Sequence, residues 1–353
     1  MNDIVKKLSI HDIHCYGSDK ILKFERQMER FFKREYKRWQ GNDEYPEKYG
    51  VNSFTGDIAN KATRNGAVNH YDEEYQVYRA FLDTIYMAYT MAYYGATNES
   101  PELDNISLEQ AQLNKYKLVV ERANIKDGQT VLDLGCGFGG LSKYLLKSYP
   151  DLTVVAINPS TVQVDHIKNV LIEQDPDFDS SRFTIIKAFF NEVEATSIFG
   201  EEHFDRVLSI GMLEHVSNID LLLKTIKLIL KHDGKCFFHC IVSLDTIPNL
   251  LSAENSQISA YFPGGHIWPY DEPQRHNTHL KFTDSWFVNG MNYWKTLEVW
   301  HERFWQAIGQ LYPEYLSIEE VDKWNKYFSL CKTMFSPNKG KSYGVGHYLY
   351  EKE

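Results

Sequence analysis

The sequence predicts an α/β protein with a doubly wound, mostly parallel sheet, and two observations carry this prediction. Between residues 130 and 242, short apolar segments alternate with amphipathic segments of helix length, which is typical of parallel strands joined by helices. The first apolar segment ends in an acidic residue and a glycine-dense turn, Asp133 to Gly140. The chain has 353 residues, of which 43% are hydrophobic, so it can bury a sizeable core.

The predicted strands are short runs rich in Val, Ile, Leu and Phe, and the predicted helices repeat apolar side chains every three or four residues. A helix at 108–123 leads into the sheet, after short helices around 75–84. We expect strands at 130–134, 153–157, 183–186, 205–210 and 235–242, with helices at 141–148, 161–173 and 220–230. Ligands of such sheets bind at the carboxyl ends of the strands.

We expect a helical segment over residues 1–66, before a main domain over 67–353. Residues 19–40 carry eight Lys or Arg and four acidic residues, with an aromatic stripe at helical spacing. This helix fits two interpretations, peripheral contact with an anionic membrane surface or packing of the stripe on the protein itself, and we favour packing. The polar stretch 41–66, rich in Gly, Asn and Asp, predicts a linker.

The composition narrows the function classes. A net charge of -10 and a pI near 5.7 disfavour nucleic acid as a partner, because phosphate binding needs a basic surface. No apolar stretch approaches the length of a membrane span, and the N-terminus lacks the apolar core of a secretory signal. Five scattered cysteines without a C-x-x-C pair indicate reduced thiols, so we expect a cytoplasmic protein.

The turn after the first strand predicts a nucleotide-type cofactor. Its pattern is G-x-G-x-G and lacks the third glycine position of the dinucleotide fingerprint. Small residues there let a ligand approach the main chain beside a helix N-terminus. The run Asp-Leu-Gly-Cys-Gly resembles the first motif of S-adenosylmethionine (SAM) dependent methyltransferases, so we expect Asp133, Gly135 and Gly137 to bind SAM.

The ends of the second and third strands carry further candidate cofactor contacts. Asn158 and Gln163 stand where many SAM enzymes place an acidic residue on the ribose hydroxyls, and both can exchange those hydrogen bonds. A turn that caps a helix at Ser160 would explain the same residues. Phe189 stands where an Asp commonly contacts the adenine amine. It could stack on the adenine ring, and a buried core Phe is the competing interpretation.

Glu214 and His215 follow the fourth strand and supply a carboxylate and an imidazole for proton handling, although such a pair often merely caps a helix. Together with other segments, this pair resembles the cyclopropane fatty acid synthase family of SAM-dependent methyltransferases. That family includes the mycolic acid methyltransferases and is related to plant alkaloid N-methyltransferases. The matching segments are His70–Asp72, Phe81–Asp83, Tyr89–Tyr94, Ala188–Phe189, Phe238–Ile241, Tyr261–Gly265, Asn292–Tyr293 and Trp300–Phe304.

The resemblance covers residues 65 to 350 and implies a class I methyltransferase fold, Rossmann-like with seven strands. It also implies an N-terminal helical cap and a helical substrate-cap insertion at about 243–340. Tyr89 and Thr90 take the place of a Tyr-Ser pair that reaches the SAM carboxylate, while the family cysteine after this pair is Met91 here.

The resemblance further implies the catalytic residues. Glu214, His239 and Tyr293 match residues that, in the synthases, hold a bicarbonate ion. This ion removes a proton after methylation of an alkene, and no metal is required. His215, beside Glu214, is a fourth candidate for proton handling.

The leading functional prediction is transfer of a methyl or methylene group from SAM to an unsaturated acyl chain of a lipid. The alternative is a small-molecule N-methyltransferase, in which Glu214 and His215 orient or deprotonate an amine. The alkaloid enzymes lack counterparts of His239 and Tyr293, which favours the lipid. The polar segment 268–280 counts against an acyl tunnel, and the run 343–348 also departs from the synthase pattern.

A non-catalytic SAM-binding protein is a third hypothesis, which the Glu-His pair makes the weakest. The expected partners are a lipid or small-molecule acceptor and a second copy of the chain in a homodimer, without nucleic acid.

Overall fold

The structure is a computed structural model that describes residues 3–40, 56–59, 64–65, 71–192, 194–244 and 265–353. The predicted linker at 41–66 lies outside these residues except for 56–59 and 64–65. The family matches at His70 and at 261–264 lie outside them as well.

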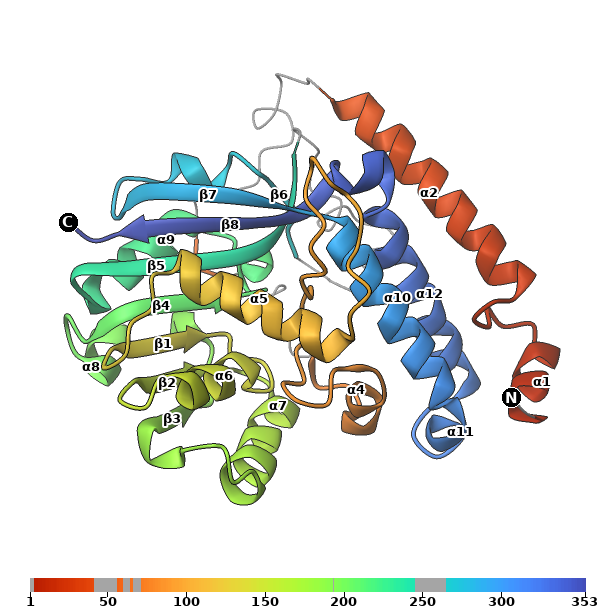
Figure 1. Cartoon of the computed structure of the whole chain (residues 1–353), viewed down its shortest axis with the longest axis horizontal. Helices are drawn as coiled ribbons and strands as arrows, with labels where there is room; N and C mark the ends of the chain where they lie inside the picture. Colours follow the sequence, from red (N-terminus) through yellow and green to blue (C-terminus); the bar gives the residue numbers. More distant parts are fainter. Residues whose placement is uncertain (1–2, 41–55, 60–63, 66–70, 193, 245–264) are drawn as a thin grey trace.

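One mixed sheet forms the centre of the molecule (Figure 1). Its main path has the order β3-β2-β1-β4-β5-β8-β7, in which the first five strands pair in parallel and β8 runs antiparallel to both neighbours. The strand order reverses between β1 and β4, which is where doubly wound sheets bind ligands. The strands are β1 (Thr130–Leu134), β2 (Thr153–Ile157), β3 (Phe183–Ile186), β4 (Phe204–Ile210), β5 (Leu230–Ser243), β6 (Trp268–Pro269), β7 (Lys281–Asn289) and β8 (Tyr343–Glu351).

Among the described residues the sheet has eight strands, so the expected number of seven was wrong. The additional strand is β6, whose two residues pair in parallel with Val242 and Ser243 of β5. The pairing of β4 with β5 ends at His239, opposite Ile210. The last residues of β5 therefore have an edge that β4 does not reach, and β6 supplies the missing hydrogen-bond partners.

Helices precede or connect the parallel strands, and three of them, α5, α7 and α9, begin with a side-chain cap that satisfies a free backbone N–H. Ser107, Ser160 and Asn218 accept backbone N–H bonds at the starts of α5, α7 and α9. The predicted helix at 161–173 changes after α7 into a π-helix, η1 (Ile167–Ile172). The helices are α5 (Leu108–Arg122), α6 (Gly140–Ser148), α7 (Thr161–His166), α8 (Ala195–Phe199) and α9 (Ile219–Ile229). Short 3-10 helices lie in the connections: η2 (Ser180–Arg182), η3 (Phe190–Glu192), η4 (Leu213–His215), η5 (Pro273–Arg275) and η6 (Pro337–Gly340).

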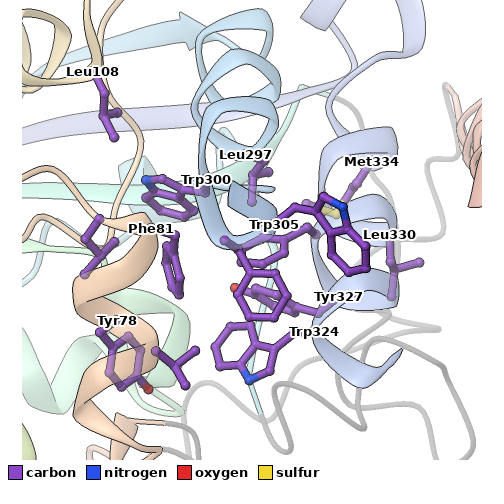
Figure 2. Packing of buried hydrophobic residues seen from close by; sticks show 14 of the residues in the cluster. Tyr78, Phe81, Leu108, Leu297, Trp300, Trp305, Trp324, Tyr327, Leu330 and Met334 are labelled. Carbon is purple, nitrogen blue, oxygen red and sulfur yellow. The ribbon is translucent and has the colours of Figure 1, made fainter. Parts of the chain in front are cut away.

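A second group of helices lies at one end of the sheet (Figure 1) and forms the cap: α4 (Tyr75–Phe81), α10 (Met291–Gln306), α11 (Ile308–Leu311) and α12 (Ile318–Met334). Aromatic side chains from α4, α10 and α12 meet in one buried cluster (Figure 2). The Phe81 ring centre lies 5.7 Å from that of Trp300 and 5.5 Å from that of Trp324. The predicted substrate-cap range 243–340 contributes α10 to α12 to this group and β7 to the sheet.

The N-terminal segment contains α1 (Asp3–Ile10) and α2 (Asp19–Trp39), and α2 lies along α12 (Figure 1). Phe32 in the aromatic stripe is fully buried, with its ring centre 6.0 Å from that of Tyr343. The stripe therefore packs on the protein, as we favoured, while contact with a membrane surface stays a prediction. No helix among the described residues is both long and apolar enough to cross a membrane.

Lys332 of α12 links α2 to the cap through two ion pairs. Its Nζ lies 2.9 Å from the Glu25 carboxylate of α2 and 2.6 Å from the Glu298 carboxylate of α10. Although burial opposes the charge, the two carboxylates raise the pKa of Lys332 above its usual value.

Candidate functional site

A cavity of about 140 Å³ lies at the strand-order reversal between β1 and β4, and we call it cavity 1. Its walls come from the carboxyl ends of the parallel strands and from the segment that precedes α5. The lining contains every residue that the sequence predicts to bind the cofactor: Tyr89, Thr90, Asp133, Gly135, Gly137, Asn158, Gln163 and Phe189.

Glycines shape the turn between β1 and α6, which forms one wall of cavity 1. Gly135 and Gly137 have φ values of +82° and +56°, in a region that other residues rarely adopt. A Cβ atom at Gly135 would lie 3.1 Å from the Met212 side chain, whereas a Cβ at Gly137 would have no atom within 4 Å. The turn thus presents bare main chain and the N-terminus of α6 to a ligand in cavity 1.

Asp133 fixes this turn to the helix that follows. Its side chain is 1% exposed, and its Oδ2 accepts a hydrogen bond of 2.7 Å from Ser142 Oγ in α6. Burial raises the pKa of the Asp133 carboxyl to about 6, because the charged form is poorly solvated there.

The structure places Asn158 and Gln163 on cavity 1 and also confirms the helix cap beside them. Ser160 Oγ accepts a hydrogen bond of 3.2 Å from the backbone N–H of Gln163. Asn158 Nδ2 donates to the Gly137 carbonyl at 3.0 Å and to Gln163 Oε1 at 2.8 Å. Asn158 therefore braces the glycine turn, and its contact with a ribose stays a prediction.

Phe189 lies between β3 and η3 and is partly exposed on cavity 1. A ring on the wall of a cavity can stack on a planar ligand, which a fully buried core ring cannot do. The position of Phe189 therefore fits the predicted stacking better than the competing core interpretation.

Tyr89 and Thr90 also line cavity 1, and each is hydrogen-bonded to a helix, Thr90 to α5 and Tyr89 to α12. Thr90 Oγ1 accepts a hydrogen bond of 2.9 Å from Lys115 Nζ of α5, and Tyr89 Oη donates one of 2.9 Å to Tyr327 Oη of α12. Burial lowers the pKa of Lys115 to about 7. Lys115 and Tyr327 were not predicted from the sequence.

A second cavity of about 70 Å³, cavity 2, adjoins the first. Five residues line both cavities and form a shared wall: Tyr71, Tyr89, Thr90, Gly211 and His215. The cap closes cavity 2 with side chains of α10 and α12, among them Leu297, Tyr327 and Met334. All four predicted catalytic residues line cavity 2: Glu214, His215, His239 and Tyr293.

Glu214 is the buried carboxyl of cavity 2. Its Oε1 accepts a hydrogen bond of 2.7 Å from the Ile241 amide of β5, whereas its buried Oε2 has no hydrogen-bond partner among the described residues. Burial raises the pKa of Glu214 to about 7. The carboxyl can therefore bind or release a proton near neutral pH, with one oxygen available to a ligand.

The neighbouring histidine and tyrosine side chains are also buried. His215 Nε2 lies 3.0 Å from Tyr71 Oη, and burial lowers the pKa of His215 to about 4. His239 Nδ1 lies 2.9 Å from His347 Nε2, and burial holds the pKa of His239 well below its usual value. Both histidines are therefore neutral at physiological pH, while burial holds the pKa of Tyr293 well above its usual value and keeps its hydroxyl protonated.

Two of the site residues that we did not predict could have been recognised from a feature of the sequence. Lys115 occupies the same face of α5 as the buried residues Ala111 and Val119, four positions away on each side, so a charge is buried there. Tyr71 stands inside a segment matched to the family. Tyr327 had no local signal, because it reaches cavity 2 only through the packing of α12.

Within the described part of the chain, no group of three or more His, Cys, Asp or Glu side chains is arranged to hold a metal ion. All five cysteines are free thiols. Cavity 1 thus offers the exposed backbone of a glycine turn to a ligand. Cavity 2 offers a titratable carboxyl, imidazole rings and phenol hydroxyls.

A family model described as mycolic acid cyclopropane synthetase matches residues 59–343. N-methyltransferase 4 from Papaver somniferum is 28% identical over 263 residues, which cover 71% of this chain and 72% of that enzyme. Cyclopropane-fatty-acyl-phospholipid synthase from Escherichia coli is 32% identical over 250 residues, which cover 69% of this chain but only 58% of that enzyme. This chain therefore spans somewhat more than half of the synthase.

Solved structures show the same fold at low identity. Coclaurine N-methyltransferase, solved with N-methylheliamine and S-adenosylhomocysteine (SAH), superposes with a TM-score of 0.78 at 20% identity and covers 99% of both chains. A cyclopropane synthase from Mycobacterium tuberculosis superposes with a TM-score of 0.66 at 23% identity, covering 84% of this chain and all of the other.

Proposed function

The chain belongs to the mycolic acid cyclopropane synthetase family and is a SAM-dependent methyltransferase, and on this premise we propose that it transfers a methyl or methylene group to an unsaturated acyl chain of a lipid. The observation that carries the proposal is the meeting of Glu214, His239 and Tyr293 in cavity 2, directly beside cavity 1. These residues come from η4, β5 and α10.

Cavity 1 fits SAM on its own features. The positive φ of Gly135 and Gly137 keeps side chains out of the turn, so an extended ligand can lie against the main chain. Asn158 and Gln163 offer polar groups where a ribose would lie, and Phe189 offers a ring for the adenine. When bound, SAM supplies an electrophilic methyl group on its sulfonium.

Cavity 2 would hold the proton acceptor of the reaction. When the electron pair of the alkene forms a C–C bond to the methyl carbon, the S–CH3 bond breaks, its electron pair stays on sulfur, and SAH is released. The neighbouring alkene carbon is then short of an electron pair. Loss of a proton from the new methyl group then releases the C–H pair to close a three-membered ring. Glu214, with a pKa of about 7, is partly protonated at neutral pH and can donate to a bound anion or take up a proton.

We propose bicarbonate as that anion, held by Glu214, His239 and the Tyr293 hydroxyl. The unpartnered Oε2 of Glu214 fits such a guest, since a buried polar atom without a partner is costly unless a ligand supplies one. Exclusion of water by the cap would keep the electron-deficient carbon from being trapped as an alcohol.

The test is incubation of the full chain with SAM and vesicles of monounsaturated phospholipid, followed by mass spectrometry of the extracted lipids. We expect a product heavier by one CH2 unit, formed at least about a hundredfold more slowly with Glu214→Gln. Turnover on secondary or tertiary amines without any lipid product would overturn the acyl acceptor.

An amine acceptor is the second candidate, favoured by the tyrosines of cavity 2. Tyr71, Tyr89, Tyr293 and Tyr327 line the same cavity as Glu214, and aromatic rings together with a carboxylate bind ammonium groups well. In this case Glu214 and His215 would orient the amine. The same incubation with a panel of benzylic secondary amines in place of vesicles distinguishes the two acceptors.

A further inference from the structure

A chain of hydrogen bonds runs from the surface of α5 to cavity 2 through two buried histidines. Arg122 Nη1 lies 2.7 Å from His347 Nδ1, and His347 Nε2 lies 2.9 Å from His239 Nδ1. His239 and His347 are 2% and 1% exposed, so water does not compete for these bonds.

The sheet positions the two histidines of this hydrogen-bonded series. His239 of β5 pairs directly with His347 of β8, and His347 pairs with Trp286 of β7. Paired residues on neighbouring strands point to the same face, so the three rings form a row. Arg122, the last residue of α5, lies above the row, with its guanidinium 4.9 Å from the centre of the Trp286 ring.

The direction of every hydrogen bond in the chain follows from the arginine. Burial lowers the pKa of Arg122 only to about 10, so the guanidinium remains protonated at neutral pH and can only donate. Burial and the nearby positive groups hold the pKa of His347 well below its usual value, so its ring is neutral and carries one proton. Since His347 Nδ1 must accept from Arg122, that proton is on Nε2. His347 Nε2 in turn donates to His239 Nδ1, and the proton of the His239 ring must also be on Nε2.

We propose that Arg122 and His347 are positioning residues that fix His239 in its Nε2–H tautomer, so that it presents a hydrogen-bond donor to an oxygen of the anion or acceptor in cavity 2. With the opposite tautomer, His239 would offer a lone pair and repel that oxygen. The role of the donor rests on the proposed function, whereas the tautomer itself can be measured without any substrate.

The primary test is imidazole nitrogen NMR on the ¹⁵N-labelled full chain at neutral pH, with the two rings assigned through His239→Gln and His347→Gln. In the wild type we expect an unprotonated Nδ1 and a protonated Nε2 for both rings. Arg122→Met removes the charged donor to His347 Nδ1 and should give a mixture of tautomers at His239. Arg122→Lys keeps a donor and should preserve the wild-type pattern.

Turnover provides the second readout. Arg122→Met and His347→Leu should each lower kcat about tenfold to a hundredfold, as is usual when a group that orients a reactive side chain is lost, with no change in the dissociation constant for SAM. His347→Gln should restore most of kcat, since its amide oxygen can accept from Arg122 while its amide nitrogen donates to His239.

Arg206→Met is the matched control, because the Arg206 guanidinium donates to the backbone carbonyls of Ala123 and Asn124 just beyond α5 and faces neither cavity. It should lower stability and leave the His239 tautomer unchanged. A protonated Nδ1 at His239 in the wild type, or a His239 tautomer that Arg122→Met leaves unaltered, would overturn the positioning role. Absence of lipid turnover with the expected tautomers would instead overturn only the proposed acceptor.

Discussion

The two adjoining cavities are built in different ways. Cavity 1 is formed largely by residues at strand ends and in the segment before α5. Positive φ values shape its turn at Gly135 and Gly137, and a hydrogen bond of 3.0 Å joins Asn158 to Gly137. Cavity 2 is formed by side chains from distant elements, such as Glu214 of η4, His239 of β5 and Tyr327 of α12. On the proposed function, backbone shape would govern binding of SAM in the first cavity, and buried titratable groups would govern the chemistry in the second.

The largest expected effect separates chemistry from binding. Glu214→Gln preserves the size of the side chain and the acceptor for the Ile241 amide but cannot take up a proton. We expect kcat to fall about a hundredfold to ten-thousandfold, with an unchanged dissociation constant for SAM by calorimetry. Glu272→Gln removes another buried carboxyl, outside both cavities, and serves as the control. Loss of SAM affinity in Glu214→Gln would break the contrast, since it would make Glu214 a cofactor contact.

The next effect concerns the cost of burying Glu214. The pKa of the Glu214 carboxyl rises from 4.5, its value in an unfolded chain, to about 7 in the folded protein. Between these pH values the folded state therefore binds more protons than the unfolded state. Stability therefore falls as pH rises through this window, by about 3 kcal/mol for this group. Glu214→Gln should exceed the wild type by that amount in free energy of unfolding above pH 7, and match it below about pH 4.5. Urea titrations at both pH values measure the difference, and a gain that is equal at both would contradict the assigned pKa.

Backbone shape in cavity 1 is tested by Gly135→Ala. The new Cβ must tolerate a positive φ and a contact of 3.1 Å with Met212, so the turn should shift and the dissociation constant for SAM should rise about fivefold to thirtyfold. Gly128→Ala is a matched control, because Gly128 has φ +76° but open space around its Cβ and lies outside both cavities. Similar losses of SAM affinity in both variants would show that backbone strain alone, rather than the shape of cavity 1, is responsible.

The smallest effect is that of Tyr293→Phe. Loss of one hydrogen-bonding hydroxyl in cavity 2 should lower kcat about tenfold, while SAM affinity stays constant. Tyr94→Phe removes a buried hydroxyl that lines neither cavity and should leave both quantities within about twofold. Equal kcat for the two variants would remove Tyr293 from the proposed proton-accepting site.

The same contrast explains what could be predicted from the sequence. Gly135, Asn158 and Phe189 follow recognisable strands, so their gathering in cavity 1 follows from the parallel pattern. The pairing of His239 with His347 spans 108 residues and depends on the register of β5 with β8, a strand that we did not predict. Local periodicity carries no information on such long-range pairing, nor on the docking of Tyr327 through α12.

On the proposed function, the shared wall lies between SAM and the acceptor and would couple their binding. Any rearrangement of Tyr71, Tyr89, Thr90, Gly211 or His215 that accommodates a guest on one side alters the shape offered to the guest on the other. Thermodynamic linkage makes this coupling reciprocal. An acceptor that raises the affinity for SAM therefore itself binds with higher affinity when SAM is bound. After transfer, the same coupling would let SAH and the methylated product weaken each other's binding. The shared wall would then promote product release at the end of each catalytic cycle.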